Sequence, residues 1–307
     1  MLQVTISEFA YQKKVVLEAV DFSLQEGEQL AIIGESGCGK STLLQLIYGL
    51  YDCEQGALFW KTTPILGPKY HLIPGMPYMK YLAQDFDLMP FITVGENVGK
   101  YLSNFFPEEK QQRIDELLEL VDMVDYKDIK AKFLSGGQMQ RVALARVLAQ
   151  EPEVLLLDEP FSHIDNFRKN ALRRKIVAYL KAKNITTLIA THDSYDVLSF
   201  SDQVLVLKEG KIIEKTTPKS LFDNPENKYV ASLFGDVNEI MLDGKIQLVY
   251  PHQLQVEANA TLRVTIQQSY YKGSHYLHEC HYQNSMLYFE DNNEYEKGKE
   301  LGLAVKK

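Results

Sequence analysis

The sequence contains few cysteines and no hydrophobic run long enough to cross a membrane. Its three cysteines, Cys38, Cys53 and Cys280, have the spacing of neither a metal site nor a disulfide framework. We therefore expect free thiols in a reducing compartment. No apolar stretch reaches the roughly 18 residues that a transmembrane helix needs, and the start, MLQVTISEFA, lacks the basic and apolar segments of a secretory signal. These absences predict a cytoplasmic protein without a membrane span.

An excess of basic charge is also absent. The net charge of −8 over 307 residues argues against nucleic acid as a partner, because phosphate backbones are held by clustered Lys and Arg. One basic run exists and fits a solvated helix face better than a site for anionic lipid or nucleic acid. It consists of Arg168, Lys169, Arg173, Arg174 and Lys175. The length allows one large domain, or a large and a small one.

Strands and helices alternate over the first 235 residues. Runs of β-branched and apolar residues predict strands at Gln3–Ser7, Val15–Leu24, Gln29–Ile33, Val154–Leu157, Thr186–Ala190 and Gln203–Leu207. Apolar residues spaced three and four apart predict helices at Thr42–Leu50, 107–126, Ser135–Gln150 and 166–183. This alternation predicts an α/β fold, with a mostly parallel sheet wrapped by helices.

The texture changes after Gly235, where helical periodicity ends. Short alternating segments follow at Lys245–Val249, Thr261–Ile266, Ser285–Glu290 and Leu301–Val305, with turn-forming residues between them. We therefore predict two domains, 1–235 and 236–307. The second is expected to be a small all-β domain with the form of a compact barrel.

A glycine-rich loop separates a predicted strand from a predicted helix. Residues 34–42, GESGCGKST, match the P-loop pattern G-x-x-x-x-G-K-[ST]. Glycines let backbone N–H groups surround phosphates, and the following helix adds its positive end. Lys40 is expected to reach the outer phosphates, and the Ser41 hydroxyl to hold Mg²⁺. The predicted nucleotide-binding residues are Gly34, Ser36, Gly37, Cys38, Gly39, Lys40, Ser41 and Thr42.

Two carboxylates follow the apolar strand Val154–Leu157. Asp158, at the strand end, is predicted to be the second Mg²⁺ contact. Glu159 is then the candidate to orient or deprotonate an attacking water. An Asp-Glu-Pro sequence at a strand end is by itself more often a turn. The P-loop earlier in the chain is what favours the catalytic interpretation.

A second phosphate-binding helix start occurs at Leu134–Arg141, LSGGQMQR. Ser135 is a good N-cap, and the glycines after it leave backbone N–H groups bare. One nucleotide in a monomer has no evident use for this second end. An ordinary capped helix is the alternative interpretation. The predicted binding residues here are Ser135, Gly136, Gly137 and Gln138.

With these motifs the chain resembles the ABC transporter ATPases, and the resemblance extends over essentially its whole length. It implies a P-loop NTPase fold with a helical subdomain. It also implies roles for four further residues. Tyr11, with Phe9 as a nearby rival, would stack on adenine. Gln84 would touch Mg²⁺ and sense the permease, Asp165 would reach the partner subunit, and His192 would contact the γ-phosphate.

The same resemblance implies a mechanism. Two copies would pair head to tail and clamp ATP between the P-loop of one and Ser135–Gly137 of the other. The catalytic residues would be Lys40, Glu159 and His192, and the metal contacts Ser41, Gln84 and Asp158. Hydrolysis would energise a membrane permease, with the protein bound peripherally at the inner face of the plasma membrane. The aromatic-rich stretch Phe86–Phe106 is the candidate groove for a permease helix, with packing inside the helical subdomain as the alternative.

The residues from Asn224 onward narrow the resemblance to one kind of ABC transporter ATPase, the importers. Asn224-Pro225, Tyr229–Ala231 and Phe234–Asn238 resemble the tail of importer ATPases for ferric iron, polyamines, sugars or oxyanions. The β-rich region resembles their accessory barrel, the TOBE domain. Import is therefore predicted, with an extracytoplasmic solute-binding protein as an indirect partner. An exporter or lipoprotein-release ATPase, or a non-transport ABC ATPase, is the alternative. No role follows from the sequence for the linker 61–81.

Overall fold

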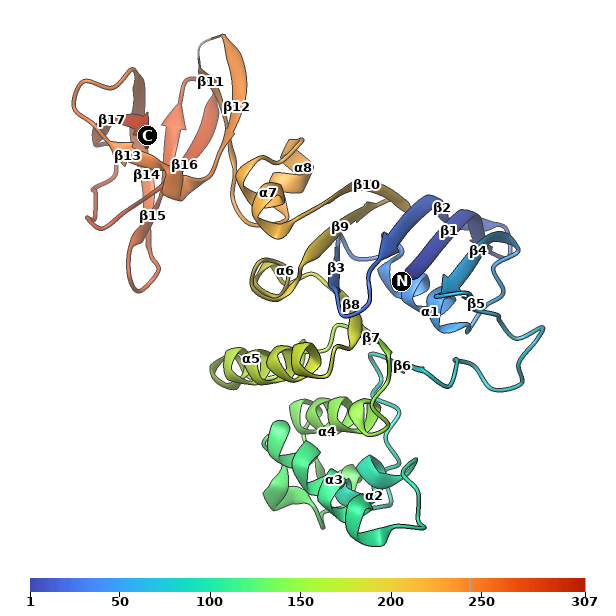
Figure 1. Cartoon of the computed structure of the whole chain (residues 1–307). Coiled ribbons are helices and arrows are strands. Elements are labelled where there is room, and N and C mark those ends of the chain that lie inside the picture. The colour runs from blue at the N-terminus through green and yellow to red at the C-terminus, as the bar shows by residue number, and fades with distance from the viewer. Residues whose placement is uncertain (243, 307) are drawn as a thin grey trace. The chain divides into compact units, whose positions relative to one another are not determined.

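The computed structural model describes residues 1–242 and 244–306, which form two compact units (Figure 1). The first unit is Met1–Pro218 and the second begins at Lys219. Among the described residues, no helix combines the length and apolarity of a membrane span.

A six-stranded sheet organises the first unit in the order β10-β9-β3-β8-β7-β6. Its strands are β3 (Gln29–Ile33), β6 (Met79–Leu82), β7 (Val154–Asp158), β8 (Thr186–Thr191), β9 (Gln203–Lys208) and β10 (Lys211–Thr216). All neighbours pair in parallel except β10, which pairs antiparallel with β9. β3, β7 and β8 are buried along their whole length, as expected for parallel strands covered on both faces. Their carboxyl ends meet at one edge of the sheet.

A second, antiparallel sheet has the order β2-β1-β4-β5. It consists of β1 (Leu2–Tyr11), β2 (Lys14–Leu24), β4 (Gln55–Trp60) and β5 (Thr63–Pro64). The helix α1 (Lys40–Tyr48) buries Leu43, Leu44, Leu46 and Ile47 in one apolar cluster with residues of both sheets. This packing fixes the direction in which the N-terminus of α1 points.

Helices make up most of the rest of the first unit, and α2, α3 and α4 gather in the green part of Figure 1. Their bounds are α2 (Val94–Gly99), α3 (Pro107–Leu120), α4 (Gly136–Leu148), α5 (Asn166–Ala182) and α6 (Ser194–Phe200), with 3-10 turns at Val124–Tyr126 and Ala131–Phe133. The predicted helix 107–126 stops at Leu120 because Asp122 takes a left-handed backbone, φ 55°. The helices α2, α3, α4 and α5 share a core with Leu155 and Leu157 of β7.

The second unit contains the short helices α7 (Pro218–Asp223) and α8 (Lys228–Ser232) and two antiparallel sheets. A hairpin joins β11 (Asn238–Leu242) to β12 (Lys245–Val249). The other sheet has the order β13-β17-β14-β15-β16. Its strands are β13 (Leu254–Val256), β14 (Leu262–Tyr271), β15 (Tyr276–Tyr282), β16 (Ser285–Asp291) and β17 (Glu300–Val305). The predicted small all-β domain is thus present among the described residues, as an antiparallel five-stranded sheet whose edge strands β13 and β16 contact each other, together with a hairpin.

Two groups of contacts hold the parts of this unit together. The side chain of Asn238 donates to the Tyr288 carbonyl at 2.7 Å and accepts from its N–H at 2.7 Å, which fastens the hairpin to β16. Phe222 of α7 stacks on Tyr250 at 4.6 Å, and the Tyr250 hydroxyl donates to the Ala231 carbonyl of α8. The helical tail therefore packs with the β strands, and the units divide at 218 where the sequence suggested 235.

Candidate nucleotide-binding site

The loop between β3 and α1 forms a cradle of backbone N–H groups. Gly37 and Gly39 have φ of 82° and 109°, values that side chains disfavour. A Cβ on Gly34 would lie 2.1 Å from the Leu207 carbonyl oxygen. Lys40 is the first residue of α1, and within the described chain no side chain caps this helix start. The exposed N–H groups and the helix dipole make the loop an anion site.

Lys40 lies against this loop and is only 8% exposed. Its ammonium donates to the Gly34 carbonyl at 2.7 Å and to the Glu35 carbonyl at 2.9 Å. A phosphate oxygen is a stronger acceptor for an ammonium than a neutral carbonyl. The lysine is therefore placed to exchange its loop contacts for a phosphate.

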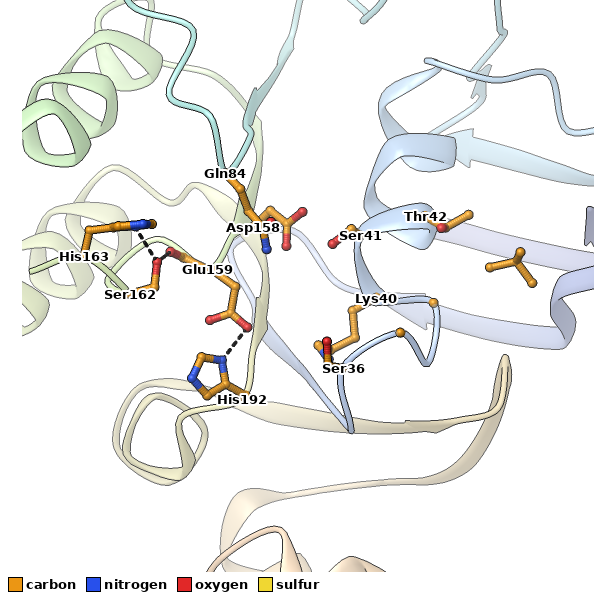
Figure 2. A pocket seen from close by; sticks show the side chains of 13 residues that line it. Ser36, Lys40, Ser41, Thr42, Gln84, Asp158, Glu159, Ser162, His163 and His192 are labelled. Carbon is orange, nitrogen blue, oxygen red and sulfur yellow. Dashed lines mark hydrogen bonds and ion pairs between the residues drawn. The ribbon is translucent and has the colours of Figure 1, made fainter. Parts of the chain in front are cut away.

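Asp158 closes β7 opposite the start of α1, and Figure 2 shows it beside Ser41 and Gln84. The side chain is buried, and burial raises its pKa, while the neighbouring Ser41 and Tyr81 hydroxyls act in the opposite direction. Its Oδ2 accepts from the Tyr81 hydroxyl at 3.2 Å. Its Oδ1 is buried and makes no hydrogen bond within the described residues. An unsatisfied carboxylate oxygen beside a hydroxyl fits a hard divalent cation such as Mg²⁺.

Glu159 and His192 face each other across the same pocket (Figure 2), with Nδ1 of the imidazole 2.8 Å from Oε1 of the carboxylate. The glutamate is positioned through its backbone, since its N–H donates to the Ala190 carbonyl of β8 at 2.9 Å and its φ is 50°. Its side chain is 13% exposed, whereas that of His192 is 71% exposed. The carboxylate is therefore sheltered at a strand end, and the imidazole stands at the pocket mouth.

The pocket beside the P-loop, here called the P-loop pocket, has a volume of about 450 Å³. Of the predicted residues, it is lined by Ser36, Gly37, Gly39, Lys40, Ser41, Thr42, Gln84, Asp158, Glu159 and His192. Val16, Ser162 and His163 line it too, and no sequence pattern indicated them. Gly34 and Cys38 do not line it. Cys38 turns a buried side chain toward Lys40, so only its backbone could serve a phosphate.

Tyr11 lies at the end of β1, outside the residues that line the P-loop pocket. Its hydroxyl donates to Thr42 Oγ1 at 3.4 Å and to Gln45 Oε1 at 3.3 Å. Its ring contacts those of Phe9 and Tyr51, with 5.1 Å and 5.2 Å between ring centroids. The predicted aromatic contact for a base is therefore a cluster of three rings, which includes the rival Phe9.

The second helix start forms a separate pocket, the signature pocket, at the N-terminus of α4. Ser135 Oγ accepts from the Gln138 N–H at 3.4 Å, and Gln138 Oε1 accepts from the Ser135 N–H at 2.8 Å, a capping box. The predicted residues Ser135, Gly136, Gly137, Gln138 and Asp165 all line this pocket. Tyr126, Arg141, His163, Ile164, Phe167 and Arg168 complete it and were not predicted.

The two pockets adjoin the same short segment after β7. His163 lines both of them. Gln140, buried in α4, donates to the Glu159 carbonyl at 2.8 Å and accepts from the His163 N–H at 3.0 Å. The start of α4 is thereby held to the backbone of the residue that carries the pocket's carboxylate.

A buried ion network lies directly behind His192. Arg173 of α5 is 3% exposed and contacts Asp193 at 2.5 Å and Asp196 at 2.6 Å, while Lys169 contacts Asp193 at 2.9 Å. The expected solvated face of α5 is therefore wrong at Arg173 and Lys169, because two acidic residues of another segment cover them. Burial raises the pKa of Asp196 to about 6. The pKa of Asp193 falls to about 2, because the hydrogen bonds from Arg173 and Lys169 outweigh its burial.

Known proteins resemble this chain over most of its length. Residues 17–162 match the ABC transporter family model. An Fe(3+) ions import ATP-binding protein of Haemophilus influenzae is 35% identical over 78% of this chain and 71% of its own length. The ATP-binding protein MsiK of a diacetylchitobiose uptake system in Streptomyces coelicolor is 34% identical over 72% of this chain and 58% of its own.

A solved structure is also similar. It is a dimeric ATP-binding cassette in a post-hydrolysis state bound to ADP and Pi, and it matches with a TM-score of 0.62 and 27% identity, over 71% of this chain and 99% of that one. This chain spans between 64% and 71% of the length of the iron-import relatives. The family match, the shared fold and the two phosphate-binding helix starts agree: the chain belongs to the ABC transporter ATP-binding family and is an ABC-type ATPase.

Proposed function

We propose that this protein is the ATP-hydrolysing subunit of a solute importer and works as a head-to-tail pair. The observation that carries the proposal is the division of its phosphate-binding groups between two pockets on one chain. The P-loop pocket holds the lysine and the carboxylates, and the signature pocket offers a second helix start, at Gly136 and Gly137. Each pocket supplies what the other lacks, so two copies related head to tail would complete two sites.

The P-loop pocket would bind ATP through its phosphates. Gly37 and Gly39 present backbone N–H groups, and Lys40 pairs with the outer phosphates. Mg²⁺ would be held by Ser41, Asp158 and Gln84, and when bound it neutralises charge on the transferring phosphoryl group. Tyr11 and its neighbouring rings would pack against adenine. The signature residues Ser135, Gly136, Gly137 and Gln138, with Asp165, would cover the nucleotide from the second copy.

Glu159 would orient the attacking water and accept its proton at a carboxylate oxygen. The hydrogen bond to His192 directs this carboxylate toward the pocket, and His192 can turn to the γ-phosphate because most of its ring is exposed. Phosphoryl transfer needs little covalent help, so the gain would come from positioning and charge.

An aromatic surface downstream of Gln84 would receive the permease. Phe91, Tyr101, Phe105 and Phe106 are 72%, 54%, 90% and 61% exposed. Four exposed rings within one short stretch of the chain, residues 91–106, favour a partner surface over internal packing. Phe86 is the exception, since it is buried and its ring contacts that of His163 at 5.2 Å. Through the permease the protein would sit at the cytoplasmic face of the membrane.

Import is favoured over export by the second unit and by the relatives. The all-β unit after α8 suits the accessory domain of importer ATPases, and an export ATPase would not need it. Relatives named for iron and for diacetylchitobiose share the cassette equally well, so the cargo would be chosen by the permease and a solute-binding protein.

The test is an affinity purification of this protein from detergent-solubilised membranes of its native host, with mass spectrometry of the chains recovered. Recovery of a multi-span permease would support the proposal, and an extracytoplasmic binding protein with it would support import. The double variant Phe105→Ser, Phe106→Ser is the matched control, expected to lose the permease and keep nucleotide binding. Recovery of cytosolic partners alone, from a complex that survives the detergent, would contradict the transport role.

A further inference from the structure

One tyrosine hydroxyl reaches the carboxylate at the centre of the P-loop pocket. Tyr81 lies on β6, which runs parallel to β7, and its Cα is paired with that of Leu156. Asp158 is two residues further along β7, on the same face. The Tyr81 hydroxyl donates to Asp158 Oδ2 at 3.2 Å. This contact belongs to none of the motifs that identify the family.

The hydroxyl is held from the other side by α1. Gln45, one turn after Ser41, makes a side-chain hydrogen bond to Tyr81 and also accepts from the Tyr11 hydroxyl at 3.3 Å. The Tyr48 ring packs on the Tyr81 ring at 5.5 Å between centroids. A tyrosine phenol keeps its proton at neutral pH, so Tyr81 is the donor in this contact.

A hydrogen bond to one oxygen of a carboxylate fixes the rotation of the whole group. Oδ2 of Asp158 is occupied by Tyr81, whereas Oδ1 is buried and unsatisfied among the described residues. The free oxygen is therefore the one available to a cation. Outer contacts of this kind orient metal ligands and commonly change metal affinity by about 10-fold to 100-fold when removed.

We propose that Tyr81 is a positioning residue that sets the Asp158 carboxylate for Mg²⁺, supported by Gln45. The inference rests on the proposed ATP–Mg²⁺ site. Tyr81 does not touch nucleotide or metal in this account, and it acts only through Asp158.

The experiment compares Tyr81→Phe with Tyr48→Phe in the full chain. Both changes remove one phenol oxygen from adjacent, half-buried rings, and only the first removes a hydrogen bond to Asp158. Binding of a fluorescent ATP analogue is measured in EDTA and then titrated with MgCl₂. We expect Tyr81→Phe to bind the analogue normally in EDTA and to need about 10-fold more Mg²⁺ for its half-maximal response. Tyr48→Phe should match the wild type in both.

Each other outcome has a distinct meaning. An unchanged Mg²⁺ midpoint in Tyr81→Phe would overturn the role of Tyr81 and leave the ATPase site standing. Loss of binding already in EDTA would also overturn it, because Tyr81 would then shape the pocket itself. If the wild-type protein showed no response to Mg²⁺, the proposed ATP–Mg²⁺ site would fail first.

Discussion

The P-loop pocket and the signature pocket both contain a helix N-terminus, but they differ in the side chains that surround it. Both begin at a helix N-terminus preceded by or containing glycine, so both offer bare N–H groups to an anion. The first is surrounded by a buried lysine, two carboxylates and an imidazole, which come from α1 and from the ends of the buried strands β7 and β8. Around the second the polar groups are mainly the capping Ser135 and Gln138 and the arginines 141 and 168.

The difference indicates a division of labour. The P-loop pocket has the lysine, carboxylates and imidazole that phosphoryl transfer would need. The wall behind His192 is held by the buried ion pairs of Arg173. The signature pocket has the groups that cover a phosphate, and its form depends on backbone clearance and a helix cap. Changes in the first pocket should therefore alter turnover or break ion pairs. Changes in the second should cost modest stability and act on turnover only through the pairing of two copies.

The largest expected effect tests the chemistry of the P-loop pocket. In Glu159→Gln the side chain keeps its size and its place beside His192 but cannot accept a proton. We expect ATP binding to persist and turnover to fall by about 10²-fold to 10⁴-fold, with the closed dimer accumulating. Phosphate release and gel filtration with ATP measure both. Unchanged turnover would remove Glu159 from the mechanism and weaken the contrast between the pockets.

The next effect tests the buried wall behind His192. Arg173→Met leaves Asp193 and Asp196 without their buried cation, and breaking such a pair costs about 3–5 kcal/mol of unfolding free energy at pH 7. Lys169→Met, a single contact nearer the surface, is the control with a smaller loss. Urea unfolding measures both variants.

The loss in Arg173→Met should shrink between pH 7 and pH 5. A carboxyl whose folded pKa is raised, as for Asp196 at about 6, takes a proton more readily when folded, so the cost of its buried charge fades as pH falls through 6. Without Arg173 this pKa rises further. In the wild type Asp193, with a pKa of about 2, stays ionised over this range, so the predicted change rests on Asp196. Equal losses at both pH values would contradict the assignment of the network.

Much of the fold followed from the sequence because the parallel strands are apolar throughout. β7 and β8 needed only a run of buried residues between turn signals, and both were predicted within one residue. β15 was missed because it carries His278 and Cys280 on its inward side, and a histidine breaks the apolar alternation although it is fully buried. The short α7 and α8 were missed as well, since they depend on contacts with the distant Tyr250: Phe222 of α7 stacks on its ring, and the Ala231 carbonyl of α8 accepts from its hydroxyl.

The site residues divide in the same way, into contiguous motifs that sequence can predict and a network of distant residues that it cannot. Contiguous motifs such as the P-loop can be found without a fold, because neighbouring residues do the work together. The network of Arg173, Asp193 and Asp196 could not be found, because its members come from α5 and from the segment after β8. In sequence such charges look like solvated surface. The roles assigned to individual site residues stay predictions until tested.

A smaller effect tests backbone clearance in the signature pocket. A Cβ on Gly137 would lie 2.6 Å from the His163 carbonyl oxygen, so Gly137→Ala must shift the start of α4. We expect a loss of about 1–3 kcal/mol in unfolding free energy. At Gly136 the nearest atom lies at 3.9 Å, and Gly136→Ala should keep its stability. If the two variants unfolded at the same urea concentration, the close approach of His163 would have no energetic weight.

The smallest change in stability separates the cap from the site. Ser135→Ala and Thr93→Ala each remove the side-chain acceptor of a capping box, at α4 and α2 respectively, and each should cost about 1 kcal/mol. Only Ser135 lines the signature pocket, so only its loss should also lower turnover, by about 10-fold, as for a hydrogen bond to a charged phosphate. Nucleotide binding at low protein concentration should be unchanged in both, because we expect the P-loop pocket to bind nucleotide without a partner. Equal turnover in the two variants would make Ser135 an ordinary helix cap, and the signature pocket would then rest on its glycine N–H groups alone.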